Sequence, residues 1–122
     1  MKINCTIIEW LKGIGVPIYE TAAGVEEDED EDGNIMYPYL VVSDTKIYEG
    51  SDERNLYIRH SLYLYYYTES GTDNRVEKWL NRQNIKFSCD KTYLEEDDAY
   101  EIEYAINEDI ITKIQEDEDV CE

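Results

Sequence analysis

Few residues of this 122-residue chain have side chains suited to catalysis or metal binding. His60 is the only histidine, and it lies among apolar residues, where a packed or hydrogen-bonded imidazole is the expected role. The chain contains no glycine-rich phosphate loop, no GxSxG and no HExxH. Thirty acidic residues make chance carboxylate pairs common, so such a pair is weak evidence for acid–base chemistry. We therefore predict that the protein is not an enzyme and needs no cofactor.

The acidic segment 26–32 holds the strongest candidate for metal binding. Asp28, Asp30 and Asp32 occupy alternate positions before a glycine, as in the first half of a calcium-binding loop. The match ends there, because Tyr39 stands where the bidentate glutamate would be and no helix is expected on either side. Adjacent carboxylates repel one another and cannot all be buried. A solvated loop is the preferred interpretation, and weak calcium binding is the alternative.

The three cysteines, Cys5, Cys89 and Cys121, form no CxxC pair and no zinc-site spacing. Reduced thiols of an intracellular protein are the simplest interpretation. No apolar run reaches the length of a membrane-spanning helix, and polar residues interrupt the amino-terminal segment where a signal peptide would be apolar. These features predict a soluble intracellular protein.

The charge balance is strongly acidic, with a formal net charge of −19 at pH 7. Binding to a nucleic-acid backbone needs Lys and Arg to neutralise phosphates, so specific nucleic-acid binding is not expected. The same excess of carboxylates argues against anionic membranes as a partner. A small acidic protein can also mimic DNA and inhibit a DNA-binding enzyme, and this is the alternative function that we retain.

Residues 54–68 are the longest segment that reads as one β-strand. One face of this strand would be mainly aliphatic, and the other would present Tyr63, Tyr65 and Tyr67, because successive side chains point to opposite sides. The aliphatic face is expected to meet the core. The tyrosine face suits either a hydrated sheet surface or contact with another subunit, so these three tyrosines are candidate oligomer-interface residues.

The remaining pattern predicts an α+β fold. It consists of a mainly antiparallel sheet of about four strands with a long β-hairpin, and two helices packed on one face. We expect one domain over residues 1–106, with an acidic loop at about 21–35, followed by an acidic carboxy-terminal tail over residues 107–122. In this tail, Ile110, Ile111 and Ile114 form the stripe of a possible short helix. The expected elements are helices at 2–14 and 72–84, and strands at 37–48, 54–68, 85–93 and 99–106.

An ordered series of short motifs runs through residues 2–106. The motifs are Gly15-Val16-Pro17-Ile18-Tyr19, Tyr37-Pro38-Tyr39-Leu40-Val41, Leu62-Tyr63-Leu64-Tyr65-Tyr66-Tyr67-Thr68, Val76-Glu77-Lys78-Trp79-Leu80, Ile85-Lys86-Phe87 and Tyr100-Glu101-Ile102-Glu103-Tyr104. In their order and spacing the chain resembles the small tail-completion or tail-terminator proteins of long-tailed bacteriophages and prophages. The acidic insert and the tail depart from the common pattern of that family.

The resemblance implies a virion structural protein without enzymatic chemistry. Such a protein would form a ring, commonly a hexamer, at the head-proximal end of the tail tube and join it to the head connector. Its partners would be other copies of itself, the tail-tube protein and a head-completion or connector protein. It would be found in the host cytoplasm during assembly and then in the virion tail. An acidic ring around a DNA passage would repel phosphate, which agrees with the charge balance.

Overall fold

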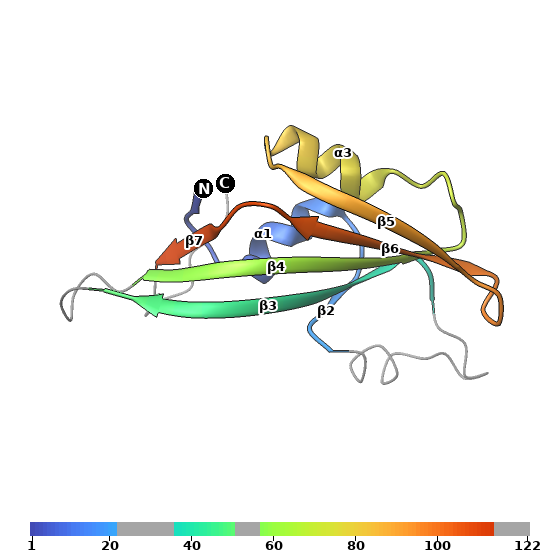
Figure 1. Ribbon diagram of the computed structural model, residues 1–122, viewed down its shortest axis with the longest axis horizontal. Coiled ribbons are helices and arrows are strands. Elements are labelled where there is room, and N and C mark those ends of the chain that lie inside the picture. Colours follow the sequence, from blue (N-terminus) through green and yellow to red (C-terminus); the bar gives the residue numbers. More distant parts are fainter. Residues whose placement is uncertain (22–35, 51–56, 114–122) are drawn as a thin grey trace.

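The computed structural model describes residues 1–21, 36–50 and 57–113. Its central element is a seven-stranded mixed sheet in which the two longest strands run the length of the molecule (Figure 1). The elements in chain order are β1 Lys2–Ile3, α1 Ile7–Leu11, the 3-10 helix η1 Lys12–Ile14, β2 Ile18–Tyr19, β3 Tyr39–Glu49, β4 Tyr57–Thr68, α3 Arg75–Arg82, β5 Phe87–Leu94, β6 Ala99–Ile106 and β7 Ile110–Lys113.

Strands β3 and β4 form an antiparallel pair from Tyr39 opposite Tyr67 to Glu49 opposite Tyr57. Both are rich in β-branched and aromatic residues, which suit a pleated surface. The other edge of β4 is shared by two strands, because β7 pairs with its first part and β6 with its second. Strand β5 extends the sheet beyond β6. Short parallel pairings attach β1 to β7 and β2 to β3.

The core lies on one face of this sheet, under both helices. Leu62, Leu64 and Tyr66 of β4 are fully or almost fully buried there, as the alternation in the sequence predicts. The same buried cluster includes Ile7, Trp10 and Leu11 of α1 and Val76, Trp79 and Leu80 of α3. The ring centroids of Trp10 and Trp79 lie 4.7 Å apart, edge to face, so the two helices meet each other over the sheet.

Hydrogen bonds to Asp73 fix the start of α3. Its carboxylate accepts from the Tyr66 hydroxyl at 2.7 Å, the Thr68 hydroxyl at 3.0 Å and the backbone N–H of Arg75 at 3.1 Å. The first two bonds come from the end of β4 and the third from the first turn of the helix. One side chain thus connects the long strand to the helix that covers it, and its bond to the backbone two residues on is one that Asp forms readily at turns.

The predicted fold class is wrong in strand number and in pairing. The sheet has seven strands and is mixed, whereas the sequence suggested about four mainly antiparallel strands with a long hairpin. The parallel contributions come from β1 and β2, which have two residues each. A two-residue strand has no readable periodicity, so its pairing depends on tertiary context.

Two segments also differ in secondary structure from the prediction. Residues 2–14 do not form one helix: they divide into β1, α1 and η1, with the Thr6 hydroxyl capping α1 by accepting from the Glu9 N–H at 3.2 Å. Ile110 and Ile111, expected on a helical stripe of the tail, belong to strand β7. Within the described ranges no helix is long and apolar enough to span a membrane.

Candidate functional site

The sheet face opposite the helices carries the tyrosines that the sequence marked as interface candidates. Tyr63 is the most exposed of them, at 43%, and Tyr65 and Tyr67 are partly buried. The residues directly beside Tyr63 in the sheet are Ser43 and Ala105, which are too small to cover its ring. The structure therefore brings the three tyrosines together on one face, with Tyr63 the least covered.

Toward one end of this face the tyrosines have more contacts within the subunit. Tyr67 stacks on Tyr39 with ring centroids 4.8 Å apart, and its hydroxyl donates to Glu101 at 2.7 Å. Tyr37 stacks on the other side of Tyr39 at 5.6 Å. Burial, helped by the neighbouring Tyr37, raises the pKa of Tyr39 to about 12. Burial and the bond to Glu101 likewise raise the pKa of Tyr67, so these hydroxyls stay protonated and able to donate hydrogen bonds at neutral pH.

A pocket of about 730 Å³ opens on the helix-side face, between the start of α1 and strands β3, β4 and β7. Its apolar lining comes from Cys5, Ile7, Ile8, Val42, Tyr48 and Ile58. Its polar lining is Thr6, Glu20, Thr21, Asp44, Lys46, His60, Thr112 and Lys113. The size is within the range of small-molecule sites.

Three side chains from adjacent strands form a hydrogen-bonded chain at this pocket. The Nδ1 atom of His60 lies 2.8 Å and 3.0 Å from the two carboxylate oxygens of Asp44, and its Nε2 atom lies 2.7 Å from Oγ1 of Thr112. When Nδ1 donates to Asp44, Nε2 accepts from the Thr112 hydroxyl. The order carboxylate, imidazole, hydroxyl is also the order found in hydrolases with a nucleophilic side chain.

The surroundings of these three hydrogen-bonded side chains favour a structural role for them. His60 and Thr112 are 3% and 4% exposed, and the backbone around Thr112 is paired on both sides, with β1 and with β4. Both ring nitrogens of His60 have protein partners, so the imidazole is fully satisfied without a ligand. The prediction that His60 is a packed or hydrogen-bonded residue is confirmed, and its bonds join β3, β4 and β7.

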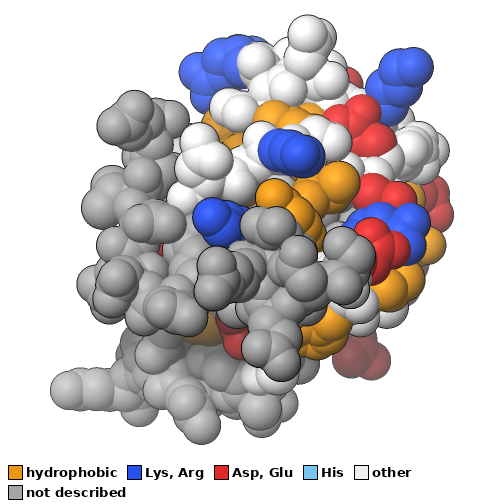
Figure 2. Space-filling model, turned by 90° about the vertical axis from the view of Figure 1, so that its left-hand side faces the viewer, with side chains coloured by type: hydrophobic (Ala, Val, Ile, Leu, Met, Phe, Trp, Pro, Cys, Tyr) orange, Lys and Arg blue, Asp and Glu red, His pale blue; other side chains and the backbone are white. Residues whose placement is uncertain are grey.

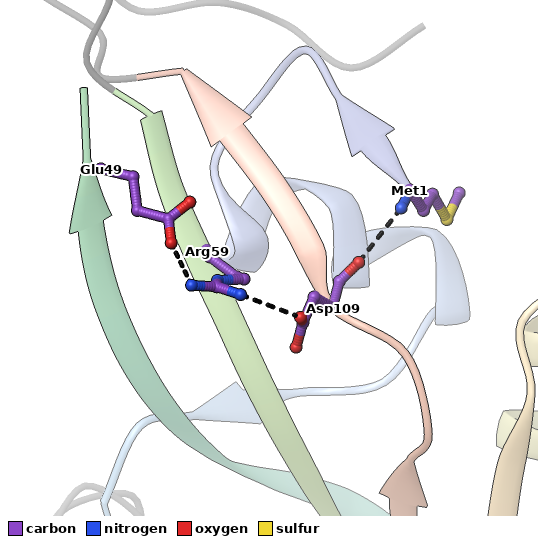
Figure 3. A network of polar contacts seen from close by, with 4 residues as sticks. All are labelled: Met1, Glu49, Arg59 and Asp109. Carbon is purple, nitrogen blue, oxygen red and sulfur yellow. Dashed lines mark hydrogen bonds and ion pairs between the residues drawn. The ribbon is translucent and has the colours of Figure 1, made fainter. Parts of the chain in front are cut away.

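At the same end of the molecule, Arg59 joins three segments on the other face (Figure 3). Its guanidinium pairs with Glu49 of β3, and it lies 3.7 Å from the carboxylate of Asp109, just before β7. The backbone carbonyl of Asp109 accepts from the amino terminus of Met1 at 3.1 Å. These contacts fix the ends of β3, β4 and β7 relative to the start of the chain.

The candidate calcium ligands Asp28, Asp30 and Asp32 lie outside the described residues, so that hypothesis stays a prediction. Among the residues that the structure does describe, no group of three His, Cys, Asp or Glu side chains is arranged to hold a metal ion. Cys89 is a free, exposed thiol on β5. Cys5 is buried and disulfide-bonded, so the expectation of reduced thiols is wrong for that residue.

Comparison with known proteins adds no relative. No family model, curated protein or solved structure matches this chain.

Sequence reasoning did not find the pocket or the partners of His60. Asp44 and Thr112 lie 16 and 52 residues from His60 in the chain, and only the register of three strands brings them together. One signal was present: a single histidine on the buried face of a strand needs polar partners from the strands beside it. It identified neither partner: Thr112 was expected in the tail and not in a strand, and the register that places Asp44 beside His60 was not known.

Proposed function

We propose that the protein is a bacteriophage tail terminator that forms a ring, with six subunits the expected number, at the head-proximal end of the tail tube. In this position it stops tube growth and joins the tube to the head connector. The observation that carries the proposal beyond the motif series is the sheet face with Tyr63, Tyr65 and Tyr67, which no described helix covers.

This face has the composition of a protein interface. Tyrosine contributes a large contact area with few rotatable bonds, and it is enriched in interface cores. Carboxylates stand beside the rings, because Glu103 lies opposite Tyr65 and Glu101 opposite Tyr67. A partner surface that offers hydrogen-bond donors, Lys or Arg therefore fits this face better than an acidic one does.

The charge of the subunit fits a ring around a DNA passage. Acidic groups that face the lumen would keep DNA phosphates from adhering while DNA moves through. A charge of −19 also opposes association of free subunits. Assembly on a tube is therefore expected to be stronger than self-association in solution, and moderate salt should assist it by screening the repulsion.

Binding to tail tubes tests this proposal. Preformed tubes of long and short average length are sedimented with the protein, and the bound amount is measured. A terminator binds in proportion to the number of tube ends, so short tubes bind more protein per tube subunit than long ones do. A double variant, Tyr63→Ser with Tyr65→Ser, should bind less, whereas Ser61→Ala on the same face should bind normally. Binding in proportion to tube length, or none, would overturn the proposal.

A further inference from the structure

Two edge segments of the sheet have no second partner among the described strands. Strand β5 pairs there with β6 alone, and residues 44–49 of β3 pair with β4 alone. An unpaired edge presents a row of backbone N–H and C=O groups that can pair with a strand of another chain. Neither strand contains a proline, the residue that most directly prevents such pairing.

From these edges we infer that the ring proposed above closes by continuing the sheet, with β3 of one subunit pairing with β5 of the next. This inference rests on the proposed function for its biological setting. The two edges are different surfaces on opposite sides of the sheet, separated by the β5–β6, β6–β4 and β4–β3 ladders. A contact between two different surfaces is heterologous, and such contacts generate rings when the rotation closes.

The strand directions fit this junction. Each ladder from β5 through β6 and β4 to β3 is antiparallel, so a neighbouring β5 that continues the alternation meets β3 antiparallel. The two edges are also offset along the strands. Strand β6, which pairs with β5, lies beside residues 63–68 of β4, whereas the open part of β3 lies beside residues 57–62 of β4. Successive subunits would therefore be staggered. A stagger between strands is also what closure of a sheet into a barrel requires.

The charges of the two edges permit close approach in an otherwise acidic protein. On β3, the two carboxylates are held within the subunit, Asp44 by His60 and Glu49 by Arg59, and Lys46 adds a positive charge. On β5, Asp90 and Lys91 contribute one charge of each sign, on opposite faces of the strand. Figure 2 shows the end of the molecule where β3 terminates, and there basic, acidic and hydrophobic side chains are interspersed over the coloured surface.

Each edge also exposes a tyrosine on the helix-side face of the sheet. Tyr48 of β3 is 64% exposed and Tyr93 of β5 is 47% exposed. In a continued sheet each ring would pack against side chains of the neighbouring strand, and such cross-strand contacts stabilise sheets. The side chains of Lys46 and Tyr48 line the pocket, so a neighbouring β5 would lie along its rim. The pocket would then be part of the junction between subunits.

Cysteine cross-linking tests the junction, because Cys89 already lies on β5 as a free, exposed thiol. Its side chain is on the helix-side face, since Cys89 pairs with the buried Tyr104. In a continued sheet, only residues on that same face of β3 bring a second sulfur within disulfide distance. The variants Lys46→Cys and Tyr48→Cys are therefore compared with Ile47→Cys, which points to the other face. Each is oxidised with diamide, both bound to tubes and concentrated in solution.

The expected result is a ladder of covalent oligomers, up to a closed ring, for Lys46→Cys or Tyr48→Cys and none for Ile47→Cys. Adding Cys89→Ser should abolish the ladder. If the protein binds tube ends but neither variant cross-links, the edge junction is wrong and the terminator proposal stands. If the ladder forms in solution while tubes bind nothing, the junction stands and the terminator proposal falls. Equal cross-linking at positions 46, 47 and 48 contradicts the junction.

Discussion

The Oγ1 atom of Thr112 lies 2.7 Å from Nε2 of His60, and this hydrogen bond joins β7 to β4 across 52 residues of the chain. The other ring nitrogen of His60 bonds to Asp44 of β3. The imidazole thus connects three neighbouring strands at the pocket beside the start of α1. These polar contacts help to hold the strands in register beside the apolar lining of the pocket.

Replacing His60 should destabilise the protein without affecting its surface. His60→Leu leaves the Asp44 carboxylate and the Thr112 hydroxyl without their partner in a largely buried place, at an expected cost of about 1–3 kcal/mol in the free energy of unfolding. Urea denaturation measures this cost. Thr112→Val removes one of the bonds at similar volume and should cost less. An unchanged midpoint for His60→Leu would show that the hydrogen-bonded chain contributes nothing to stability.

The second prediction concerns the buried face of β4. Leu64 is completely buried among residues of both helices and the sheet. Leu64→Ala should lower the free energy of unfolding by about 2–5 kcal/mol, because it removes apolar contacts and leaves a cavity. Thermal or urea denaturation measures the change, and the exposed Ser61→Ala is the matched control on the same strand. If Leu64→Ala lowers the free energy of unfolding by less than Ser61→Ala does, the core does not pack around Leu64.

The third prediction is a pH dependence at Asp73. Burial alone would raise the pKa of this carboxyl, but the bonds from Tyr66, the Arg75 N–H and Thr68 outweigh burial and lower the pKa below its ordinary value of 3.8. Its contribution to stability is therefore present above the unfolded pKa and is lost as the pH falls through the folded pKa. Asp73→Asn should be less stable than the native chain at pH 7.

Denaturant unfolding of both proteins at a series of pH values measures the difference. The stability difference should stay constant at neutral pH and narrow below about pH 4, where Asp73 of the unfolded chain takes up a proton while the folded carboxyl is still charged. A gap that is the same at pH 3 and pH 7 would contradict the assignment of the three hydrogen bonds to the charged form.

The fourth prediction separates two roles among the tyrosines. Tyr67→Ala should reduce stability, because Tyr67 stacks on Tyr39 and bonds to Glu101 within the subunit. Tyr63→Ala should leave the unfolding midpoint within about 0.5 kcal/mol of the native value, since Tyr63 is exposed and has small neighbours. The Tyr63 change should instead weaken binding to tube ends. The reverse pattern would mean that Tyr63 has a structural role and Tyr67 an interface role.

The sequence predicted those elements whose pattern is local and long. The alternation around Leu62 and Leu64 correctly identified the buried face of β4, and the stripe of Val76, Trp79 and Leu80 identified α3 and its buried side. In both cases the period of the apolar residues alone determines which side faces the core. The order of the strands across the sheet could not be read in the same way.

The elements that the sequence did not predict depend on distant partners. Strand β7 has only four residues, and its consecutive isoleucines fit a helix as well as a strand until β1 and β4 are placed beside it. Likewise, nothing local marks Asp44 and Thr112 as partners of His60. The tyrosine face was predicted, whereas the open edges follow only from the register of the sheet.

The length of tail tubes tests the central claim most directly. Tube subunits are polymerised with increasing amounts of the protein in moderate salt, and tube lengths are measured by electron microscopy. The terminator proposal predicts tubes that become shorter as the protein is added, each with a ring at one end, and no shortening with the Tyr63→Ser, Tyr65→Ser double variant. Tubes of unchanged length without terminal rings would contradict it.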